Sequence, residues 1–429
     1  MWKVRQGLKG RIYSYSFTPD LLTLLYPEAP SWVNISGQSN TEIDNLLKDN
    51  PSILEDQLLK HTLPIKKLSP EHLLRNPVLR LTNRCNLQCS HCYQASNVSM
   101  RNGKRDLTLE DVKKFIYFIE DLSRTHQWPI ETIQLFGGET CLNPSFLEIL
   151  EFLASRDFRG IRISTNGVPK ILKSKEIKPY IAQYNIEWRI ALESHIPEYQ
   201  NKIRPVNSYK RVIETIRHFT GNGANVSVKA VLTDENLAHL HDTLNFLREN
   251  GVNQYSYNIL SLIGNAFQGE MPKLVNHLDV VRAIDAILQK DATLSSMLHP
   301  TPFGRWLKLI YGADFRVYPR IQYYVDANGD IYPNDTVYEI DAFQVGNISI
   351  LSETLSALIA SQAELETKKK LCLHCPIEPF CFRGNYGGLY SVDSSMQKEF
   401  PECQSMRDAV AFIMQLGDRG REYTRAMYT

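Results

Sequence analysis

The sequence lacks any long apolar run, and this absence limits where the protein can work. No apolar stretch in its 429 residues approaches the roughly 20 residues that a helix needs to cross a bilayer. Residues 1–7 also lack the apolar centre of a secretory signal peptide. We therefore expect a cytoplasmic protein that has no membrane partner.

The sequence also lacks an excess of charge of either sign. Lys and Arg number 48 and Asp and Glu number 47, so the formal net charge is +1. This balance gives the whole molecule no electrostatic field that would attract nucleic acid or an anionic membrane. We therefore expect no nucleic-acid partner. Internal repeats and low-complexity tracts, which would indicate a solenoid or a disordered chain, are missing as well.

Cysteine is scarce, but its distribution is uneven. Of the eight cysteines, three lie between positions 85 and 92, four lie between 372 and 403, and Cys141 stands alone. Thiols stay reduced in the cytoplasm, so grouped cysteines there favour metal binding or catalysis over disulfides.

From residue 77 to about residue 258, short apolar runs alternate with longer amphipathic stretches. Such alternation predicts a parallel sheet with right-handed crossovers, in which functional residues gather at the carboxyl ends of the strands. We therefore predict an α/β fold, a partial (β/α)6 TIM-like barrel. The predicted strands are 78–81, 132–136, 161–164, 187–192, 226–232 and 254–258, and the predicted helices are 109–122, 144–153, 174–183, 209–219 and 237–249.

The remaining chain divides into three further regions. Residues 1–76 are predicted to form a small N-terminal region with a strand at 32–35 and short helices at 41–47 and 51–59. The predicted barrel occupies 77–262, and a helical linker with a helix at 278–288 occupies 263–320. The last region, 321–429, contains a hairpin signal at Asp326–Gly329 and a helix at 406–416.

The first cysteine group has the spacing Cys85-x3-Cys89-x2-Cys92. Thiolates suit both iron–sulfur clusters and zinc. A closed site normally needs four protein ligands, and no fourth cysteine lies nearby, so three ligands would leave one iron open to a small molecule. A zinc site completed by His91 or by a distant residue remains the alternative.

This motif resembles that of the radical S-adenosylmethionine (SAM) superfamily. The resemblance implies a [4Fe–4S] cluster on Cys85, Cys89 and Cys92, with the amino and carboxylate groups of SAM on the open iron. It further implies reductive cleavage of SAM to a 5′-deoxyadenosyl radical, which abstracts hydrogen from a substrate carbon. An electron donor such as flavodoxin or ferredoxin is then expected as a partner.

The same resemblance assigns a SAM pocket to the ends of the predicted strands. Glycines allow close backbone approach, and carboxylate and guanidinium groups suit the ammonium and carboxylate groups of SAM. Plain Gly-Gly-Glu and Asn-Gly turns and a surface arginine are the alternatives. At the fourth strand, Ala191 replaces a serine that is usual in the family. The assigned residues are Tyr93 at the adenine, Gly137 and Gly138 at the backbone approach, Glu139 at the methionine ammonium, Asn166 at the ribose or carboxylate, and Arg204 at the carboxylate.

The second cysteine group comprises Cys372, Cys375, Cys381 and Cys403, and structural zinc is one interpretation of its spacing. The segments 324–333 and 345–348 that precede it resemble the SPASM/Twitch extension of radical SAM enzymes. The resemblance implies one auxiliary [4Fe–4S] cluster on these four thiolates, because Ile321, Asn334 and Asn385 stand where further cysteine ligands are usual. It also aligns Asp335 with a catalytic base of sulfatase-maturing relatives; a turn aspartate is the alternative.

Relatives with this extension mostly modify peptides or proteins. We therefore expect a maturase that acts on a precursor peptide and installs a crosslink in a ribosomally synthesised peptide. Residues 1–76 either dock the precursor by adding a strand to a sheet edge or cap the barrel. A sulfatase-type maturase that oxidises Ser or Cys is the nearest alternative, and a zinc-binding interaction protein is the distant one.

Overall fold

The computed structural model describes residues 3–6, 11–18, 21–26, 31–36, 42, 45, 70–93, 106–205, 207–260, 264–267, 274–312, 322–334, 337, 340–368, 375–377, 380–381 and 402–428. Within these ranges, no helix combines the length and the apolar character that a membrane crossing requires.

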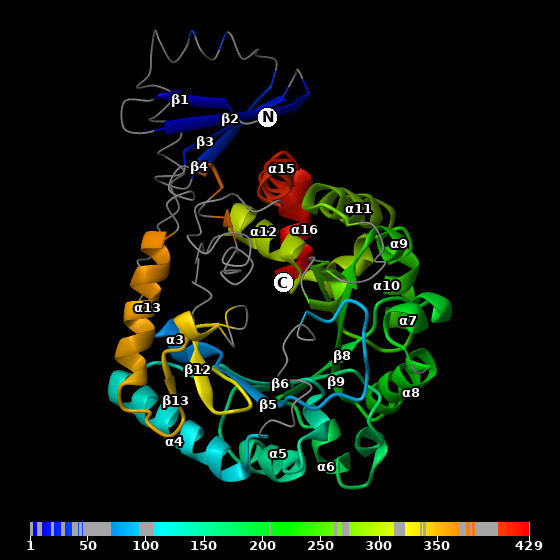
Figure 1. Ribbon diagram of the computed structural model, residues 1–429. Helices are drawn as coiled ribbons and strands as arrows, with labels where there is room; N and C mark the ends of the chain where they lie inside the picture. Colours follow the sequence, from blue (N-terminus) through cyan, green and yellow to red (C-terminus); the bar gives the residue numbers. More distant parts are fainter. Residues whose placement is uncertain are drawn as a thin grey trace.

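Six parallel strands form the centre of the molecule and pair in chain order (Figure 1). Each strand is followed by helical structure that covers the outer face of the curved sheet, which confirms the predicted partial (β/α)6 barrel. The strands are β5 (Val78–Thr82), β6 (Thr132–Gly137), β7 (Gly160–Thr165), β8 (Ile186–Ala191), β9 (Asn225–Leu232) and β10 (Gln254–Ile259). The outer helices are α4 (Leu109–His126), α5 (Phe146–Ala154), α6 (Lys178–Ile181), α7 (Pro197–Ile203), α8 (Ser208–Gly221), α9 (Asp234–Leu237) and α10 (Leu240–Glu249).

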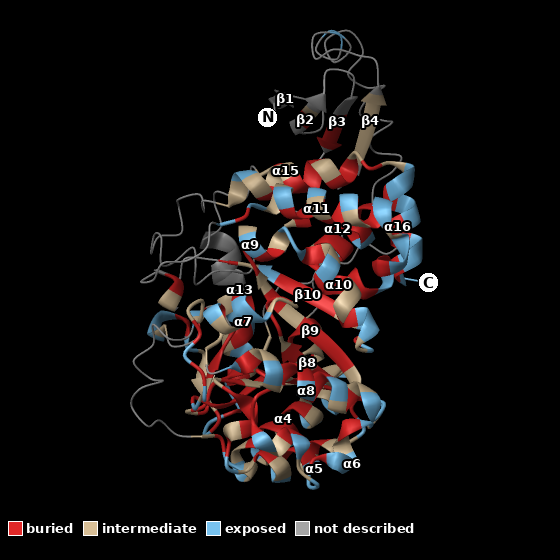
Figure 2. Ribbon diagram, turned by 90° about the vertical axis from the view of Figure 1, so that its right-hand side faces the viewer, coloured by how far each residue is buried: buried red, intermediate tan, exposed pale blue. Residues whose placement is uncertain are grey.

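Alternation along the strands separates the two faces of this sheet. In β7, Ile161 and Ile163 are fully buried, whereas Arg162 and Ser164 between and after them are only partly buried. The neighbouring strands β6 and β8 alternate in the same way. Apolar side chains thus pack against the helices, where burial stabilises the fold, and Figure 2 shows this buried layer along the strands. The partly buried polar face is called the lumen face below.

Local signals position some helix starts, and three of the predicted helices differ from the observed ones. Helix α4 starts at a capping box in which Thr108 and Asp111 exchange hydrogen bonds. The helix predicted from residue 144 instead begins at Phe146, because the Asn143 side chain accepts a hydrogen bond from the Ser145 N–H and holds Pro144 in a turn. The helix predicted at 174–183 shortens to α6 after the 3-10 turn η4 (Lys170–Lys173). The helix predicted at 237–249 begins at Leu240 as α10, and the short helix α9 precedes it.

The N-terminal region contains an antiparallel four-stranded sheet, whereas the sequence predicted only one strand there. The predicted strand at 32–35 lies in the last of the four, and residues 42 and 45 are helical. Residues 51–59, predicted as a helix, lie outside the described residues. The strands are β1 (Lys3–Gln6), β2 (Arg11–Thr18), β3 (Leu21–Tyr26) and β4 (Ser31–Ser36).

The C-terminal region continues the barrel sheet. Strand β11 (Tyr324–Val325) pairs in parallel with β5, and β12 (Asp330–Tyr332) and β13 (Gly346–Asn347) follow it at the edge. Gly329, with φ +83°, closes the predicted hairpin between β11 and β12. The other described elements are α3 (His72–Arg75), η3 (Thr140–Leu142), η5 (Gly264–Phe267), α11 (His277–Lys290), η6 (Ala292–Leu298), α12 (Pro302–Tyr311), η7 (Asp341–Phe343), α13 (Thr354–Lys368), α15 (Cys403–Met414) and α16 (Asp418–Tyr428).

Candidate active site

The first three cysteines lie in a loop that follows the carboxyl end of β5. Cys89 is buried, and Cys85 and Cys92 are partly exposed. The backbone N–H of Ser90 donates to the Ile203 carbonyl at 3.0 Å, which ties this loop to the end of α7. Asn265 in η5 holds its other side, because its amide Nδ2 donates to the Cys89 carbonyl at 2.9 Å and its backbone N–H donates to the Cys92 carbonyl at 3.0 Å. Sequence reasoning missed Asn265, which lies 176 positions from Cys89 and belongs to no motif.

The Gly-Gly-Glu segment at the end of β6 packs directly against the backbone that leads into the cysteine loop. The Gly138 N–H donates to the Thr82 carbonyl at 2.9 Å, and the Glu139 N–H donates to the Arg84 carbonyl at 2.7 Å. A Cβ atom on Gly138 would lie 2.4 Å from the Arg84 carbonyl oxygen. The glycine is therefore required where the chain approaches its own backbone, one residue before Cys85.

Glu139 is a buried carboxylate at the centre of the strand ends. It accepts hydrogen bonds from Thr165 Oγ1 at 2.7 Å, from the Asn166 N–H at 2.6 Å and from the Cys141 N–H at 3.2 Å. Burial raises the pKa of Glu139, and these hydrogen bonds oppose that shift. The Cys141 thiol also hydrogen-bonds this carboxylate.

Asn166 connects the end of β7 to the cysteine loop. Its Nδ2 donates to Asn86 Oδ1 at 2.8 Å, and Asn86 lies between Cys85 and Cys89. Its Oδ1 accepts from the Val168 N–H at 3.0 Å. Three predicted site segments, from β5, β6 and β7, are thus joined by hydrogen bonds. The contact of Asn166 with SAM itself stays a prediction.

Arg204 lies beneath the cysteine loop, and its side chain is only 14% exposed, so it is not the surface arginine of the alternative interpretation. Its Nε donates to Glu193 Oε1 at 2.7 Å, and a terminal nitrogen lies 3.8 Å from the Cys89 sulfur. The other terminal nitrogen lies 3.4 Å from His91 Nε2, which is itself 3.3 Å from Glu193 Oε1. A guanidinium, a carboxylate and an imidazole therefore converge next to one of the predicted cluster ligands.

The charges in this group reinforce one another. Burial alone would raise the pKa of Glu193, but Arg204 and His91 lower it to about 2. Burial would likewise lower the pKa of Arg204, but Glu193 and Cys89 raise it above its ordinary value. Glu193 ends the fourth barrel strand in the sequence, but only the folded chain shows that it pairs with Arg204.

The donor set of the cysteine loop fits an iron–sulfur cluster. Burial, together with the charges of Glu139, Cys89 and Cys92, raises the pKa of Cys85 to about 12, so the thiols lie close enough to repel one another as thiolates. A bound cationic cluster would remove that penalty, as metals do for coordinating thiols. Among the described residues, no three His, Cys, Asp or Glu side chains form a site for a single metal ion. The ligands of a cubane bind separate irons and need not converge on one point.

The described part of the second cysteine group lies between α13 and the start of α15. Burial raises the pKa of Cys375 to about 11, and the nearby Cys381 adds to the shift. Arg407 hydrogen-bonds the Cys375 side chain and lies one helical turn after Cys403. Cys372 and Asp335 lie outside the described residues, so their predicted roles stay predictions.

Two further features complete the site region. Tyr93, assigned to the adenine, is 37% exposed directly after the cysteine loop.

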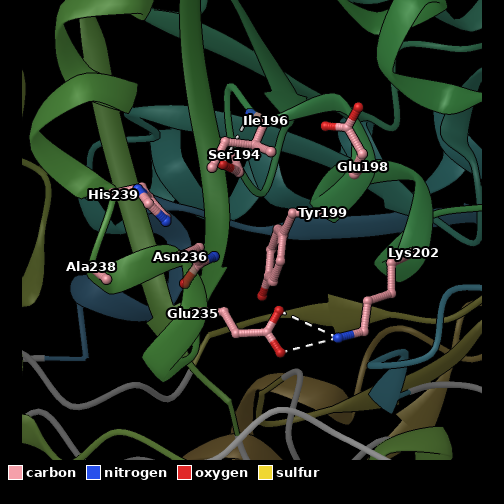
Figure 3. A pocket seen from close by; sticks show the side chains of 9 residues that line it. All are labelled: Ser194, Ile196, Glu198, Tyr199, Lys202, Glu235, Asn236, Ala238 and His239. Atoms are coloured by element: carbon pink, nitrogen blue, oxygen red, sulfur yellow. Dashed lines mark hydrogen bonds and ion pairs between the residues drawn. The ribbon is translucent and has the colours of Figure 1, made fainter.

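A separate pocket of about 420 Å³ lies beside α7, where the Lys202 ammonium pairs with the Glu235 carboxylate (Figure 3). It is lined by Ser194, Ile196, Glu198, Tyr199, Lys202, Glu235, Asn236, Ala238 and His239, none of which is a predicted site residue.

Comparison with known proteins agrees with this geometry. Residues 79–247 match the family model of the Radical SAM superfamily. The antilisterial bacteriocin subtilosin biosynthesis protein AlbA of Bacillus subtilis is 26% identical over 216 residues, which cover 50% of this chain and 46% of AlbA. The chain spans about half the length of the curated relatives it matches.

Solved structures share the fold over most of the chain. Streptococcus suis SuiB bound to the precursor peptide SuiA has a TM-score of 0.60 at 14% identity, covering 94% of this chain and 100% of SuiB. The protein anSMEcpe with bound AdoMet and the Cp18Cys peptide has a TM-score of 0.63 at 14% identity, covering 82% of this chain and 99% of the other. Residues 79–247 thus form a Radical SAM domain.

Proposed function

We propose that this protein is a radical SAM enzyme that abstracts hydrogen from a peptide substrate and thereby installs a crosslink in a ribosomally synthesised peptide. One observation carries the proposal: the hydrogen bonds that join the cysteine loop to Glu139 and Asn166 at the neighbouring strand ends. Metal ligands, a buried carboxylate and amide groups are thereby gathered at the carboxyl end of one parallel sheet, where such barrels carry their chemistry.

When bound, a [4Fe–4S] cluster would supply one electron for the reductive cleavage of SAM, from which the hydrogen-abstracting radical would come. Cys85, Cys89 and Cys92 would hold the cluster. Glu139 would supply the carboxylate for the methionine ammonium. Arg204 keeps a positive charge next to Cys89 and the SAM carboxylate, and Glu193 fixes the orientation of that charge.

The second cysteine group is assigned to an auxiliary [4Fe–4S] cluster held by Cys372, Cys375, Cys381 and Cys403. Four thiolates would leave no iron open to substrate, so electron transfer or structural support suits this cluster better than substrate binding. The hydrogen bond from Arg407 to Cys375 supports the assignment, because cations beside thiols favour the thiolate that an iron site needs.

A peptide substrate is supported by the relatives named above. AlbA takes part in bacteriocin biosynthesis, SuiB binds the precursor peptide SuiA, and anSMEcpe binds a peptide together with AdoMet. The antiparallel sheet β1–β4 offers β1 and β4 as edges to which a precursor strand could be added. Flavodoxin or ferredoxin remains the proposed electron donor.

Anaerobic reconstitution tests the radical chemistry. With SAM and dithionite, the wild type should release 5′-deoxyadenosine, and Cys89→Ala should abolish that release. We expect about eight irons per chain, from two cubanes, and about four in Cys89→Ala. Cys141→Ala removes a buried thiol that belongs to neither group and should retain the wild-type iron content. Release that is undiminished in Cys89→Ala would contradict the proposal.

Co-expression with a short peptide encoded beside the gene tests the substrate. Mass spectrometry should find a product with a new bond between two residues, recognisable by missing fragments between them. Oxidation confined to a single Ser or Cys would instead indicate the sulfatase-type maturase.

A further inference from the structure

The lumen face carries charged side chains in the rows beneath the proposed SAM site. The strand register aligns Arg162 with Glu187, and it aligns Ser164, Arg189 and Ser227 in the next row towards the carboxyl ends. Ala191, beside the proposed SAM site, lies two residues beyond Arg189, a rise of roughly 7 Å along the strand. Arg189 therefore lies about one side-chain length below Ala191 along the strand.

The Glu187 carboxylate accepts hydrogen bonds from Arg162, Arg189 and Ser227. Glu187 Oε2 accepts from Arg162 Nε at 2.7 Å, and Glu187 Oε1 accepts from Arg189 at 3.0 Å and from Ser227 Oγ at 2.7 Å. Arg162 has a second acceptor in Gln134 Oε1, at 3.3 Å. Two guanidinium groups thus share a single negative charge.

Arg189 has fewer hydrogen-bond partners than Arg162. Its Nε is buried and has no hydrogen-bond partner, whereas Arg162 uses its Nε. Burial and the charge of Arg162 lower the pKa of Arg189 to about 10, and Glu187 only partly opposes this shift. The Arg189 side chain is still 17% exposed, so part of it is open to an incoming group. A guanidinium with an unpartnered donor favours a carboxylate, to which two of its N–H groups can donate together.

We propose that Arg189 binds a carboxylate of the substrate, so that the substrate class is a peptide with an Asp or Glu side chain at or next to the residue that loses hydrogen. The proposal rests on the proposed function and goes beyond it by naming this acidic residue. Arg162 and Glu187 position Arg189, and Ser227 holds Glu187.

Two pools of synthetic peptides test the proposal on the full-length, reconstituted protein with SAM. Both pools have blocked termini and about three randomised positions on each side of a fixed residue, which is Glu in one pool and Gln in the other. Bound peptides are separated by ultrafiltration and counted by mass spectrometry. The wild type should favour the Glu pool by roughly tenfold or more, as a charge-assisted hydrogen bond would give. Arg189→Gln should lose this preference, and Arg189→Lys should keep part of it.

Controls separate this binding role from folding and from the proposed function. Arg124→Gln changes an arginine on α4 that is 77% exposed, and it should leave the preference intact. Substrate-free release of 5′-deoxyadenosine should be equal in the wild type and in Arg124→Gln, and its failure in the wild type would contradict the proposed function instead. Equal binding of both pools by the wild type, or an unchanged preference in Arg189→Gln, would overturn the inference. If thermal melting shows that Arg189→Gln is unfolded, Arg189→Lys decides, and an undiminished preference in that variant counts against the proposal.

Discussion

At the scale of single residues, the site depends on contacts that leave no space for a side chain. Gly138 lies where the backbone after β6 crosses the backbone that leads into Cys85, and its N–H and the following Glu139 N–H both donate across this crossing. The position of the first cluster ligand is therefore coupled to the absence of a Cβ atom at Gly138.

Gly138→Ala should destabilise the protein and weaken the first cluster. The new Cβ atom would lie 2.4 Å from the Arg84 carbonyl oxygen, so the backbone before Cys85 must move. We expect a loss of about 1–3 kcal/mol in the free energy of unfolding, as for other overpacked sites, and a lower iron content after reconstitution.

Thermal melting and iron analysis measure both effects, and Gly221→Ala is the matched control. No atom lies within 4 Å of a Cβ built on Gly221 at the end of α8. This variant should match or slightly exceed the wild-type stability, because alanine favours helix. Equal behaviour of the two variants would show that the close approach at Gly138 is not required.

Single residues also show how far sequence reasoning reaches into the site. The spacing of Cys85, Cys89 and Cys92 is visible in the sequence because the three ligands lie within one loop. The clamp by Asn265 joins segments that are 176 residues apart, and the pairing of Arg204 with Glu193 spans helix α7, so no local pattern indicates either contact. The charged lumen face was open to prediction, since Glu187 and Arg189 alternate with buried Trp188 and Ile190 in a strand that was expected.

At the scale of elements, the hairpin between β11 and β12 contains a buried carboxylate whose ionisation lowers the stability of the folded state. Asp326 accepts hydrogen bonds from the Asn328 N–H at 2.8 Å and from the Asp330 N–H at 2.9 Å, which shape the turn. Burial nevertheless raises the pKa of Asp326 from 3.8 to about 6. The folded state therefore binds this proton more tightly than the unfolded state does.

This shift has a defined consequence for stability. Below pH 3.8 Asp326 is protonated in both the folded and the unfolded state, so it does not change the free energy of unfolding. Between pH 3.8 and about 6 it ionises more readily in the unfolded state, so the free energy of unfolding falls as the pH rises. Above about pH 6 it is ionised in both states, and the loss of stability is complete. Asp326→Asn keeps an acceptor for the turn and removes the charge. The stability of this variant relative to wild type should thus rise by roughly 2 kcal/mol from pH 4 to pH 7.

Urea unfolding of both proteins across this pH range measures the difference. The exposed Asp341 lies in the same region of the chain, and Asp341→Asn controls for the loss of one negative charge. A constant difference between wild type and Asp326→Asn would show that Asp326 does not titrate near pH 6.

Some strands could be predicted from the sequence and others could not. The barrel strands were predicted within one or two residues because apolar runs lie between amphipathic helices. Strand β2 was missed, although Tyr13 and Tyr15 alternate with Ser14 and Ser16 as a half-buried strand requires. The joining of β11 to β5 was not predicted either, because nothing in a two-residue strand specifies its distant partner.

At the scale of the whole molecule, the N-terminal sheet packs against the C-terminal helices, as both views show (Figures 1 and 2). Asn34 Nδ2 donates to the Met414 carbonyl at 2.7 Å, and the Tyr15 hydroxyl donates to Asp408 at 2.9 Å. Both partners lie on α15, the helix that begins at Cys403. The sheet therefore supports the helix that supplies one proposed ligand of the auxiliary cluster.

Trp32 extends this support to a second ligand. Its ring meets Phe380 edge-on, with centroids 6.3 Å apart, and meets Tyr311 in the same way at 6.2 Å. Phe380 is fully buried, precedes Cys381 directly, and accepts a hydrogen bond from Trp306 Nε1 through its carbonyl. The position of Cys381 thus depends on an aromatic cluster to which the N-terminal sheet contributes one ring.

Trp32→Ala should therefore loosen the auxiliary cluster and leave the first cluster intact. Removing the indole takes away its packing against Phe380 and Tyr311, so the segment that carries Cys375 and Cys381 loses its support on this side. Iron content should fall from about eight towards about four per chain, while reductive release of 5′-deoxyadenosine without substrate continues. Tyr184→Ala, which removes an aromatic ring that is 87% exposed, should change neither quantity. If Trp32→Ala keeps all its iron, the N-terminal sheet does not stabilise the auxiliary cluster; if it loses the release of 5′-deoxyadenosine as well, the two clusters are not supported independently.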